Sequence, residues 1–283
     1  MPHPPPPTPK INSSQTTIAA APVVRFAGPE ALESAFASAG FSLALSAADP
    51  PLSESKIVEA CKLAMDWSVR SGSPRFFNQL YGRAELVSIV GDWVATAVNA
   101  NVHTFEVAPL FTLMEQHCIA RLARAVGTGF EQNHEGIFVP GGSMGNLYAM
   151  NLARHRICPE LLRRGASGGP KLIAFVSAEA HYSYLKSARL LGIGADNLIS
   201  VPVDAAGGMR ATALREAIRD ARADGGVPFF VGATSGSTVR GAFDPLVALA
   251  AVCSDERDAH VGAPALWLHV DAGQSFYTSF PPM

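Results

Sequence analysis

The sequence predicts an α/β fold in which helices cover both faces of a mostly parallel sheet, with a helical segment in front of it. Two observations support this prediction. From Gly136 onward, short apolar runs alternate with amphipathic stretches of helical length, and strands that alternate with helices form parallel βαβ units. The chain has 283 residues, of which 48% are hydrophobic, so it is long enough to bury one large core around such a sheet.

Residues 1–22 are predicted to form a disordered tail. They are dominated by Pro, Ser, Thr and Ala, with proline at every position from Pro4 to Pro7, and they lack the apolar periodicity of a packed element. The tail also lacks the apolar centre of a secretory signal. An organelle-targeting peptide stays open as an alternative, because Lys10 and Arg25 precede the first acidic residue, Glu30.

Residues 23–135 are assigned to an N-terminal helical segment, because apolar residues recur at helical spacing from Ser53 to about Arg124. The hydroxyl of Ser53 or Ser55 suits the N-cap of a first helix. A second apolar stripe follows at Leu86, Ile89, Val90, Trp93, Ala97 and Val98. Pro109 suits the first turn of a third helix, where a missing N–H costs nothing.

Residues 136–272 are assigned to the sheet domain. Its strands are predicted at Gly136–Val139, Lys171–Ser177, Leu198–Val203, Pro228–Thr234 and Leu266–Val270. Helices are predicted between them, near Met144–Arg156, Tyr182–Leu191, Ala211–Ala223 and Pro245–Cys253. Residues 273–283 suit neither the next helix nor the next strand, so we expect a divergent tail at which the architecture is cut off.

Composition and charge argue against several classes of protein. The net charge of −2 and the pI near 6.4 provide no basic face for nucleic acid. No apolar stretch has the length that a membrane span requires. The four cysteines form no CxxC pair, which argues against a metal site or a disulfide framework and favours a cytoplasmic protein.

A glycine-rich loop is expected between the first predicted strand and the helix that follows it. The loop reads Pro140-Gly141-Gly142-Ser143-Met144-Gly145-Asn146. Glycines let the backbone approach a ligand closely, and the N-terminus of a helix offers free N–H groups to an anion, so the loop suits a phosphate. An ordinary strand-to-helix turn is the alternative.

The same loop contains the pattern G-x-S-x-G, the nucleophile elbow of α/β hydrolases. In that interpretation Ser143 is the nucleophile and Asp244 orients the catalytic base. Either His260 or His269 would be the base, since both follow Asp244 in the chain as the order Ser, Asp, His requires. A serine hydrolase is therefore a second candidate function.

Further polar residues follow predicted strands, where open α/β sheets bind their ligands. His181 suits stacking on a flat ligand or proton transfer, and a hydrogen-bonded loop histidine is the alternative. Asp271 ends the last apolar run. A carboxylate there needs a partner such as a protonated pyridine nitrogen, and a helix N-cap is the alternative. The hydroxyls of Ala233–Thr238 allow a ligand to approach closely, although this segment also fits a simple turn.

Seven segments of the chain, taken together and in this order, carry a family resemblance. They are Pro74–Leu80, Thr104–Phe111, Leu113–Gln116, Pro140–Gly142, Ala180–Ser183, Gly241–Pro245 and Trp267–Ala272. The chain resembles the group II pyridoxal-phosphate (PLP)-dependent amino-acid decarboxylases, in particular the glutamate and cysteine-sulfinate decarboxylase branch. The resemblance implies a large domain of the aspartate-aminotransferase type, incomplete at its C-terminus, and decarboxylation of an amino acid with PLP as the cofactor.

The resemblance also implies roles for individual residues. The family's histidine at the position of His181 stacks on the PLP ring, and its aspartate at the position of Asp271 pairs with the pyridine nitrogen. A glycine-rich loop holds the phosphate, and a hydroxyl residue lies near the 3′-oxygen. The residues that match this loop and this hydroxyl position are Gly142, Ser143, Gly145, Asn146 and Ser237.

The substrate and the assembly are likewise implied by the resemblance. Asn78 and Gln79 match a segment that contacts an acidic group on the substrate. We therefore expect an acidic amino acid, either glutamate, cysteine sulfinate or aspartate. The complete protein is expected to be a homodimer, because related enzymes are dimers with active sites near the interface.

The family's Schiff-base lysine follows the aspartate well downstream, whereas no lysine of this chain follows Asp271. The lysines of the chain are Lys10, Lys56, Lys62, Lys171 and Lys186. We therefore expect a fragment of a decarboxylase that is active when complete, and we expect this chain alone to be inactive. A short non-catalytic isoform that binds or regulates full-length subunits is the alternative.

Overall fold

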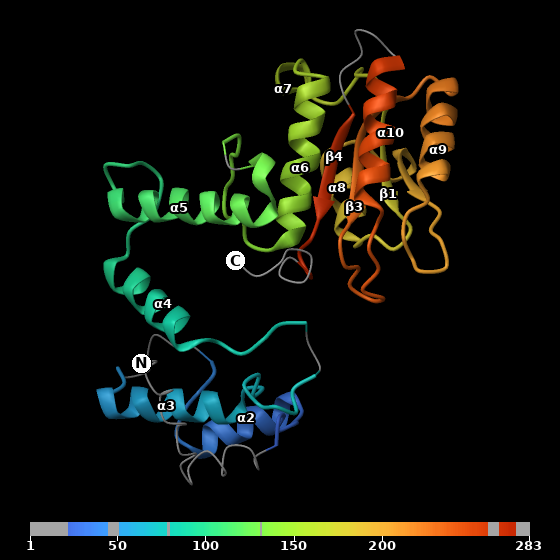
Figure 1. Ribbon diagram of the computed structural model, residues 1–283. Coiled ribbons are helices and arrows are strands. Elements are labelled where there is room, and N and C mark those ends of the chain that lie inside the picture. The colour runs from blue at the N-terminus through green and yellow to red at the C-terminus, as the bar shows by residue number, and fades with distance from the viewer. Residues whose placement is uncertain (1–21, 45–50, 78–79, 131, 260–265, 276–283) are drawn as a thin grey trace, which may run out of the picture. The chain divides into compact units, whose positions relative to one another are not determined.

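The computed structural model describes residues 22–44, 51–77, 80–130, 132–259 and 266–275 (Figure 1). The chain divides into two compact units, residues 1–100 and residues 101–283. The described part of the first unit is helical, and the second unit contains the sheet.

The first unit contains the helices α2 (Pro29–Ser38), α3 (Glu54–Trp67) and α4 (Leu86–Val98). Of the two predicted N-cap residues, Ser53 and Ser55, Ser53 is the N-cap, because its side chain accepts a hydrogen bond from the N–H of Lys56 at 3.4 Å. The sequence signals used above do not predict α2, although Pro29 occupies its first turn, where proline is favoured.

The second unit is built around a four-stranded parallel sheet. Its strands are β1 (Leu172–Ser177), β2 (Leu198–Val201), β3 (Val227–Thr234) and β4 (Trp267–Asp271), in the order β2-β1-β3-β4. All neighbouring strands pair in parallel, which confirms the predicted α/β class. Every residue of β1 is buried, and so is every residue of β3 after Val227, as expected for strands covered on both faces.

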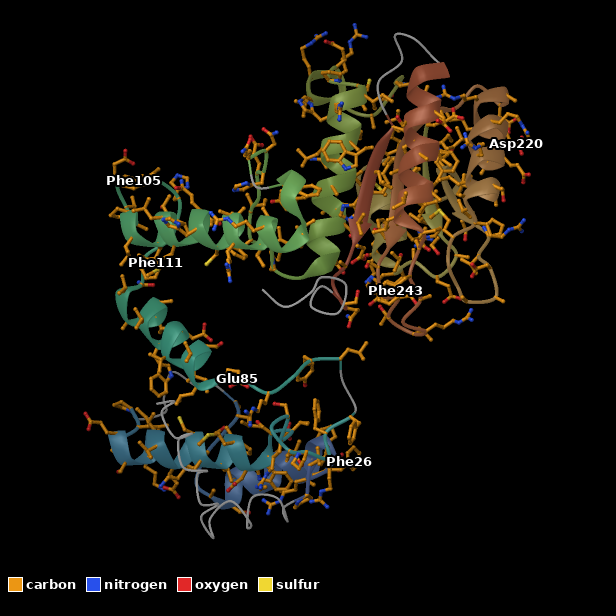
Figure 2. All side chains as sticks on the ribbon, viewed as in Figure 1. Phe26, Glu85, Phe105, Phe111, Asp220 and Phe243 are labelled. Carbon is orange, nitrogen blue, oxygen red and sulfur yellow. The ribbon has the colours of Figure 1, made fainter. Side chains whose placement is uncertain are left out.

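Helices cover both faces of this sheet (Figure 1). The helices of the unit are α5 (Pro109–Val126), α6 (Gly142–Ile157), α7 (Leu161–Arg164), α8 (Ser183–Leu190), α9 (Ala211–Ala223) and α10 (Leu246–Ala259), with short 3₁₀ turns η1 (Thr128–Phe130) and η2 (Ala195–Asn197). Pro109 lies in the first turn of α5 as predicted. Asp220, labelled in Figure 2, is an exposed residue of α9.

The core has two parts, one on each face of the sheet, because side chains alternate along a strand. Ile173 and Phe175 of β1 pack in one cluster with Leu214 of α9 and Leu249 of α10. The intervening residues of β1 pack in the other cluster with Met150 of α6 and with residues of α8. Helices α9 and α10 therefore close one face, and α6 and α8 close the other.

A glycine in β3 makes room for an aromatic ring on the second of these faces. Tyr184 of α8 is 1% exposed and lies against Gly232. A Cβ added to Gly232 would lie 2.9 Å from Cε1 and 3.0 Å from Cζ of Tyr184, and 3.1 Å from Cγ1 of Val176. The tyrosine ring thus fills the space that any larger residue at this position would need.

The loop after β3 is fastened back to the strand by a buried carboxylate. Asp244 follows Phe243, which is labelled in Figure 2. Its oxygens accept hydrogen bonds from the N–H of Met209 at 2.6 Å and of Thr234 at 2.7 Å. Burial raises the pKa of Asp244, and these two hydrogen bonds oppose that shift. The end of β3 and the turn before α9 are therefore held by one side chain.

One predicted strand is wrong. Residues Gly136–Val139 are described without helix or strand, and they have no ladder partner among the described residues. Ile137 and Phe138 are 62% and 59% exposed within this structure. An apolar run becomes a strand only where a neighbouring chain supplies the hydrogen bonds. The predicted strand Leu198–Val203 is also too long, because Val203 makes only an isolated antiparallel bridge to Met209.

Gly232→Ala is expected to destabilise the protein by about 1–3 kcal/mol, because the added methyl group meets the Tyr184 ring and the Val176 side chain. Urea or thermal unfolding measures this free energy. The matched control is Gly91→Ala in α4, where no heavy atom lies within 4 Å of the added Cβ. That change should stabilise the helix by about 0.5–1 kcal/mol. A Gly232→Ala variant as stable as the parent would contradict the packing described here.

Candidate active site

A cavity of about 160 Å³ lies at the carboxyl ends of β3 and β4. Its lining residues are Gly142, Ser143, Asn146, His181, Thr234, Gly236, Thr238, Asp271, Gly273 and Gln274. Thr234 and Asp271 are register partners at the ends of their strands. This edge of the sheet is where open α/β folds bind their ligands, and the loops predicted to carry chemistry meet there.

The N-terminus of α6 supplies one wall of the cavity. Gly141 precedes the helix with φ of 93°, a conformation that residues with a Cβ rarely adopt. Gly142 and Ser143 follow it in the first turn and line the cavity. Their backbone N–H groups belong to the helix end that has no intrahelical acceptor, so this wall suits an anionic group such as a phosphate.

His181 lines the cavity just after β1, at the start of α8. Its Nδ1 accepts a hydrogen bond from the N–H of Ser183 at 3.2 Å. Its ring lies 4.2 Å, centroid to centroid, from the ring of Tyr182. The hydrogen bond at Nδ1 leaves the proton of the neutral ring on Nε2, and it fixes one edge of the imidazole.

Asp271 is the last residue of β4 and is half-buried at the cavity. Its Oδ1 accepts a hydrogen bond from the N–H of Gly273 at 3.0 Å, and its Oδ2 accepts one from Nδ2 of Asn146 at 2.8 Å. The bond to Gly273 is a local turn interaction of the kind expected for an aspartate at a strand end. The bond to Asn146 brings in a residue from a different element.

The side-chain amide of Asn146 is hydrogen-bonded to other side chains and not directed at the N-terminus of α6, the part of the cavity that suits a phosphate. Its side chain is 3% exposed, and its Oδ1 lies 2.8 Å from Nε2 of His269 on β4. Because Nδ2 donates to Asp271, Oδ1 is an acceptor and Nε2 of His269 carries the proton. Burial lowers the pKa of His269, and the nearby Asp271 carboxylate opposes this, so the imidazole is favoured in its neutral form.

Two buried hydroxyls near the cavity have no hydrogen-bond partner among the described residues. They are Oη of Tyr184 and Oγ1 of Thr234. Burial raises the pKa of Tyr184, and the charge of Asp271 adds to this effect. Unsatisfied buried hydroxyls are uncommon in native structures, and one of these two belongs to Thr234, which lines the cavity.

The remaining predicted site residues lie in different places. Gly145 and Ser237 are not among the residues that line the cavity. The Oγ of Ser237 instead accepts a hydrogen bond from the N–H of Ala242 at 3.1 Å, and Thr238 is the hydroxyl residue that lines the cavity. Asn78 and Gln79 lie outside the described residues.

The residues of the hydrolase interpretation are not hydrogen-bonded to one another in the described structure. Asp244 accepts hydrogen bonds from two backbone N–H groups and from the side chain of Ser177, and Nε2 of His269 pairs with Asn146. His260 lies outside the described residues. The structure therefore assembles no Ser143-centred triad from the described side chains, whereas it does assemble Asp271, His181 and the start of α6.

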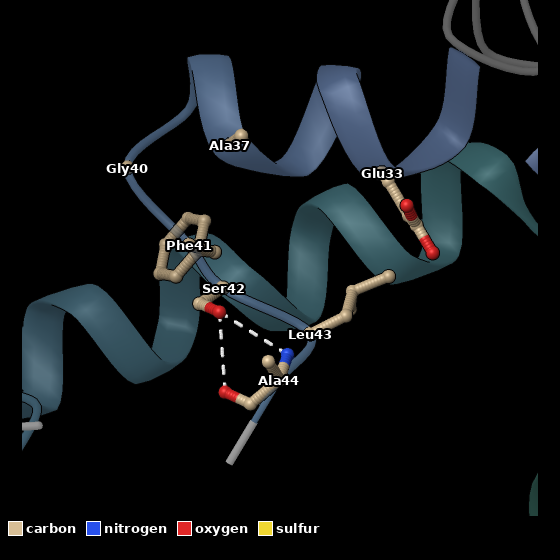
Figure 3. A pocket seen from close by; sticks show the side chains of 7 residues that line it. All are labelled: Glu33, Ala37, Gly40, Phe41, Ser42, Leu43 and Ala44. Atoms are coloured by element: carbon tan, nitrogen blue, oxygen red, sulfur yellow. Dashed lines mark hydrogen bonds between the residues drawn. The ribbon is translucent and has the colours of Figure 1, made fainter. Parts of the chain in front are cut away.

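A second hollow lies in the first unit, between α2 and the segment that follows it (Figure 3). It has a volume of about 680 Å³, and Glu33 is the one ionisable side chain among its lining residues.

The described residues contain no cluster that could bind a metal ion. The described helices are too short or too polar to cross a membrane. Among the described residues that the sequence analysis singled out, His181, Asp271 and the first turn of α6 lie together at the cavity at the sheet edge.

The chain belongs to the pyridoxal-dependent decarboxylase family. Residues 40–276 match the family's conserved domain, described as "Pyridoxal-dependent decarboxylase conserved domain". This confirms the resemblance stated from the sequence. PLP is the cofactor of this family, and the match includes every residue of the cavity described above.

The curated relatives have names that refer to acidic amino acids. The chain is 45% identical over 217 residues to human "Acidic amino acid decarboxylase GADL1", covering 77% of this chain and 40% of that protein. It is 43% identical over 220 residues to human "Cysteine sulfinic acid decarboxylase", covering 78% and 42%. A crystal structure of mouse CSAD superimposes with a TM-score of 0.82 at 39% identity, covering 91% of this chain and 50% of that one. The chain spans less than half the length of these curated relatives.

The pH dependence of stability tests the environment of His269. Because burial lowers its pKa below the unfolded value, the neutral ring contributes stability above the unfolded pKa of about 6.5, and this is lost as pH falls through the folded pKa. Among the described residues, the titratable groups that face it are Asp271 and Tyr184. We expect His269→Gln to reduce the loss of unfolding free energy between about pH 7 and 5, measured by urea denaturation.

The control for this measurement is His155→Gln, at an exposed position of α6. It should leave the slope of stability against pH as it is in the parent protein. An identical slope in the parent and in His269→Gln would show that His269 is not the neutral, buried group described here.

Proposed function

We propose that this chain forms the cofactor-binding half of a PLP-dependent decarboxylase of acidic amino acids. The observation that carries the proposal is Asp271, whose carboxylate faces a cavity also lined by His181 and by the N-terminus of α6. These are three groups of different chemistry at one sheet edge. Family membership and the names of the relatives support the same activity.

PLP fits the charges of this cavity. Its phosphate is an anion, which matches the N–H groups of Gly142 and Ser143 at the start of α6. Its protonated pyridine nitrogen is a cation, which matches the carboxylate of Asp271. His181 offers the edge or face of an imidazole between them. An anion-binding helix end and a carboxylate in a single cavity form an arrangement that suits a molecule carrying both charges.

When bound, PLP supplies an electron-withdrawing ring that takes up the electron pair left by departing CO₂. The role proposed for this chain is to hold that ring. Asp271 would keep the proton on the ring nitrogen, His181 would pack against the ring, and the first turn of α6 would hold the phosphate.

The acidic substrate, the homodimer and the cytoplasmic location stay predictions. The relatives are named for acidic amino acids and for cysteine sulfinic acid, which supports an acidic substrate. Asn78 and Gln79, proposed to contact its side chain, lie outside the described residues. No lysine lines the cavity among the described residues, so we propose that a lysine for the cofactor comes from elsewhere in the complete enzyme.

Cofactor binding is the first test. Asp271→Asn removes the negative charge opposite the pyridine nitrogen and should weaken PLP binding by roughly ten- to hundredfold, as expected for a hydrogen bond to a charged group. Equilibrium dialysis of the purified protein against PLP measures this. Asp220→Asn is the matched control, because Asp220 is an exposed residue of α9. If both variants bind PLP like the parent, the cavity is not the cofactor site.

Release of CO₂ tests the reaction itself. With saturating PLP, the purified chain should decarboxylate glutamate, cysteine sulfinate and aspartate no faster than free PLP does, because no lysine is among the described residues that line the cavity. A chimera tests the complete site. It joins, after Ala272, the residues that follow the matched segment in human cysteine sulfinic acid decarboxylase.

The chimera should release CO₂ from at least one of these acidic substrates and not from leucine. Turnover by the chain alone would contradict the requirement for a further lysine. Equal turnover of leucine by the chimera would contradict the proposed acidic specificity.

A further inference from the structure

We propose that Asn146 is a positioning residue that sets the orientation of the Asp271 carboxylate and joins it to the loop of His181. This role differs from phosphate binding, which the position of Asn146 in the glycine-rich loop suggests. The proposal rests on the proposed function, because it assigns Asp271 to the cofactor ring. It concerns how the protein prepares that carboxylate before a cofactor arrives.

The first argument is that the side-chain amide of Asn146 is fully used. Nδ2 donates to Oδ2 of Asp271 at 2.8 Å and to Oγ of Ser183 at 2.9 Å, and Oδ1 accepts from Nε2 of His269 at 2.8 Å. An asparagine amide has two N–H groups and one oxygen. Because Asn146 is only 3% exposed, each of these groups is satisfied by protein rather than by solvent.

The second argument is that the direction of the amide is fixed. Rotating it by half a turn would place Oδ1 against the carboxylate of Asp271 and a donor against Nε2–H of His269, so both contacts would become repulsive. The His269 ring cannot easily move to accommodate this, because it packs 6.2 Å from the ring of Tyr184 and 5.8 Å from that of Phe230, centroid to centroid. His269 therefore keeps the donor of Asn146 facing Asp271.

The third argument is that both oxygens of the carboxylate are held. Oδ1 accepts from the N–H of Gly273 in its own turn, and Oδ2 accepts from Asn146 of α6. Two donors in different directions fix the plane of the carboxylate, while the half-buried side chain still lines the cavity. Without Asn146, the carboxylate would be held at one oxygen only and could rotate.

The fourth argument is that the amide of Asn146 is also connected to His181, the residue proposed to pack against the cofactor ring. Ser183, which is 1% exposed, receives a hydrogen bond from Asn146 at its Oγ and donates its backbone N–H to Nδ1 of His181. A continuous chain of hydrogen bonds thus runs from Asp271 through Asn146 and Ser183 to His181. Three elements, α6, α8 and β4, are fastened at one point.

The test is a double-mutant cycle on PLP affinity, measured by equilibrium dialysis. Asn146→Ala should weaken PLP binding by about tenfold, because one hydrogen bond to a charged group is lost. The same substitution in an Asp271→Ala background should change the affinity by less than about twofold, since a residue that acts through Asp271 has no further effect once it is gone. Asn151→Ala, also on α6 but bonded to Arg154, is the matched control and should bind PLP like the parent.

His269 provides a second pair of variants if Asn146→Ala does not fold. His269→Phe keeps a ring against Tyr184 and Phe230 but lacks the donor, so it should weaken PLP binding severalfold. His269→Gln places an N–H near the position of Nε2 and should restore affinity. A purely structural role would instead favour the ring-preserving Phe variant. Thermal unfolding of each apo protein separates folding from binding.

The outcomes separate this inference from the function on which it rests. If Asp271→Ala weakens PLP binding while Asn146→Ala has no effect, or the same effect in both backgrounds, the positioning role is wrong and the cofactor site stands. If Asp271→Ala leaves PLP affinity unchanged, both ideas are wrong. Recovery by His269→Phe rather than by His269→Gln also overturns the positioning role.

Discussion

The parallel pairing of β3 with β1 and β4 is the constraint on which the rest of the second unit depends. A strand buried on both faces has no choice of register without exposing apolar side chains or leaving backbone groups unpaired. This register sets Thr234 opposite Asp271, and it brings the loops after β1 and β3 to the same edge. The chemistry of the site is therefore a consequence of strand packing, and the loops need only carry suitable residues.

Two carboxylates of the second unit, Asp244 and Asp271, are held by hydrogen bonds but have different roles. The carboxylate of Asp244 fastens backbone to backbone and takes no part in lining the cavity. Asp271 is also held by donors but stays half-buried at the cavity. The difference lies in what surrounds them. The oxygens of Asp244 accept hydrogen bonds that hold the fold together. Asp271 lines the cavity and accepts a hydrogen bond from the amide of Asn146, which is bonded in turn to the neutral imidazole of His269.

Sequence patterns were sufficient for the elements whose burial dictates their composition. The helix at Ala211–Ala223 and the buried strands follow directly from apolar periodicity, and the residues around the cavity could be placed at strand ends. The patterns failed where tertiary contacts decide. Gly136–Val139 is apolar but lacks a strand partner. The role of Asn146 depends on His269 and Asp271, 123 and 125 positions away, and spacing within a loop carries no information about such partners. Likewise, only the turn geometry after β3 decides that Thr238, and not Ser237, lines the cavity.

The packing of Tyr184 on Gly232 has a historical consequence. The two positions are not free to diverge independently. A smaller residue at 184 beside a glycine leaves a void, which lowers stability, and a side chain at 232 beside an intact tyrosine ring is a clash between buried groups. A larger residue at 232 and a smaller one at 184 would compensate for each other, so descendants of this sequence are expected to change the two positions together.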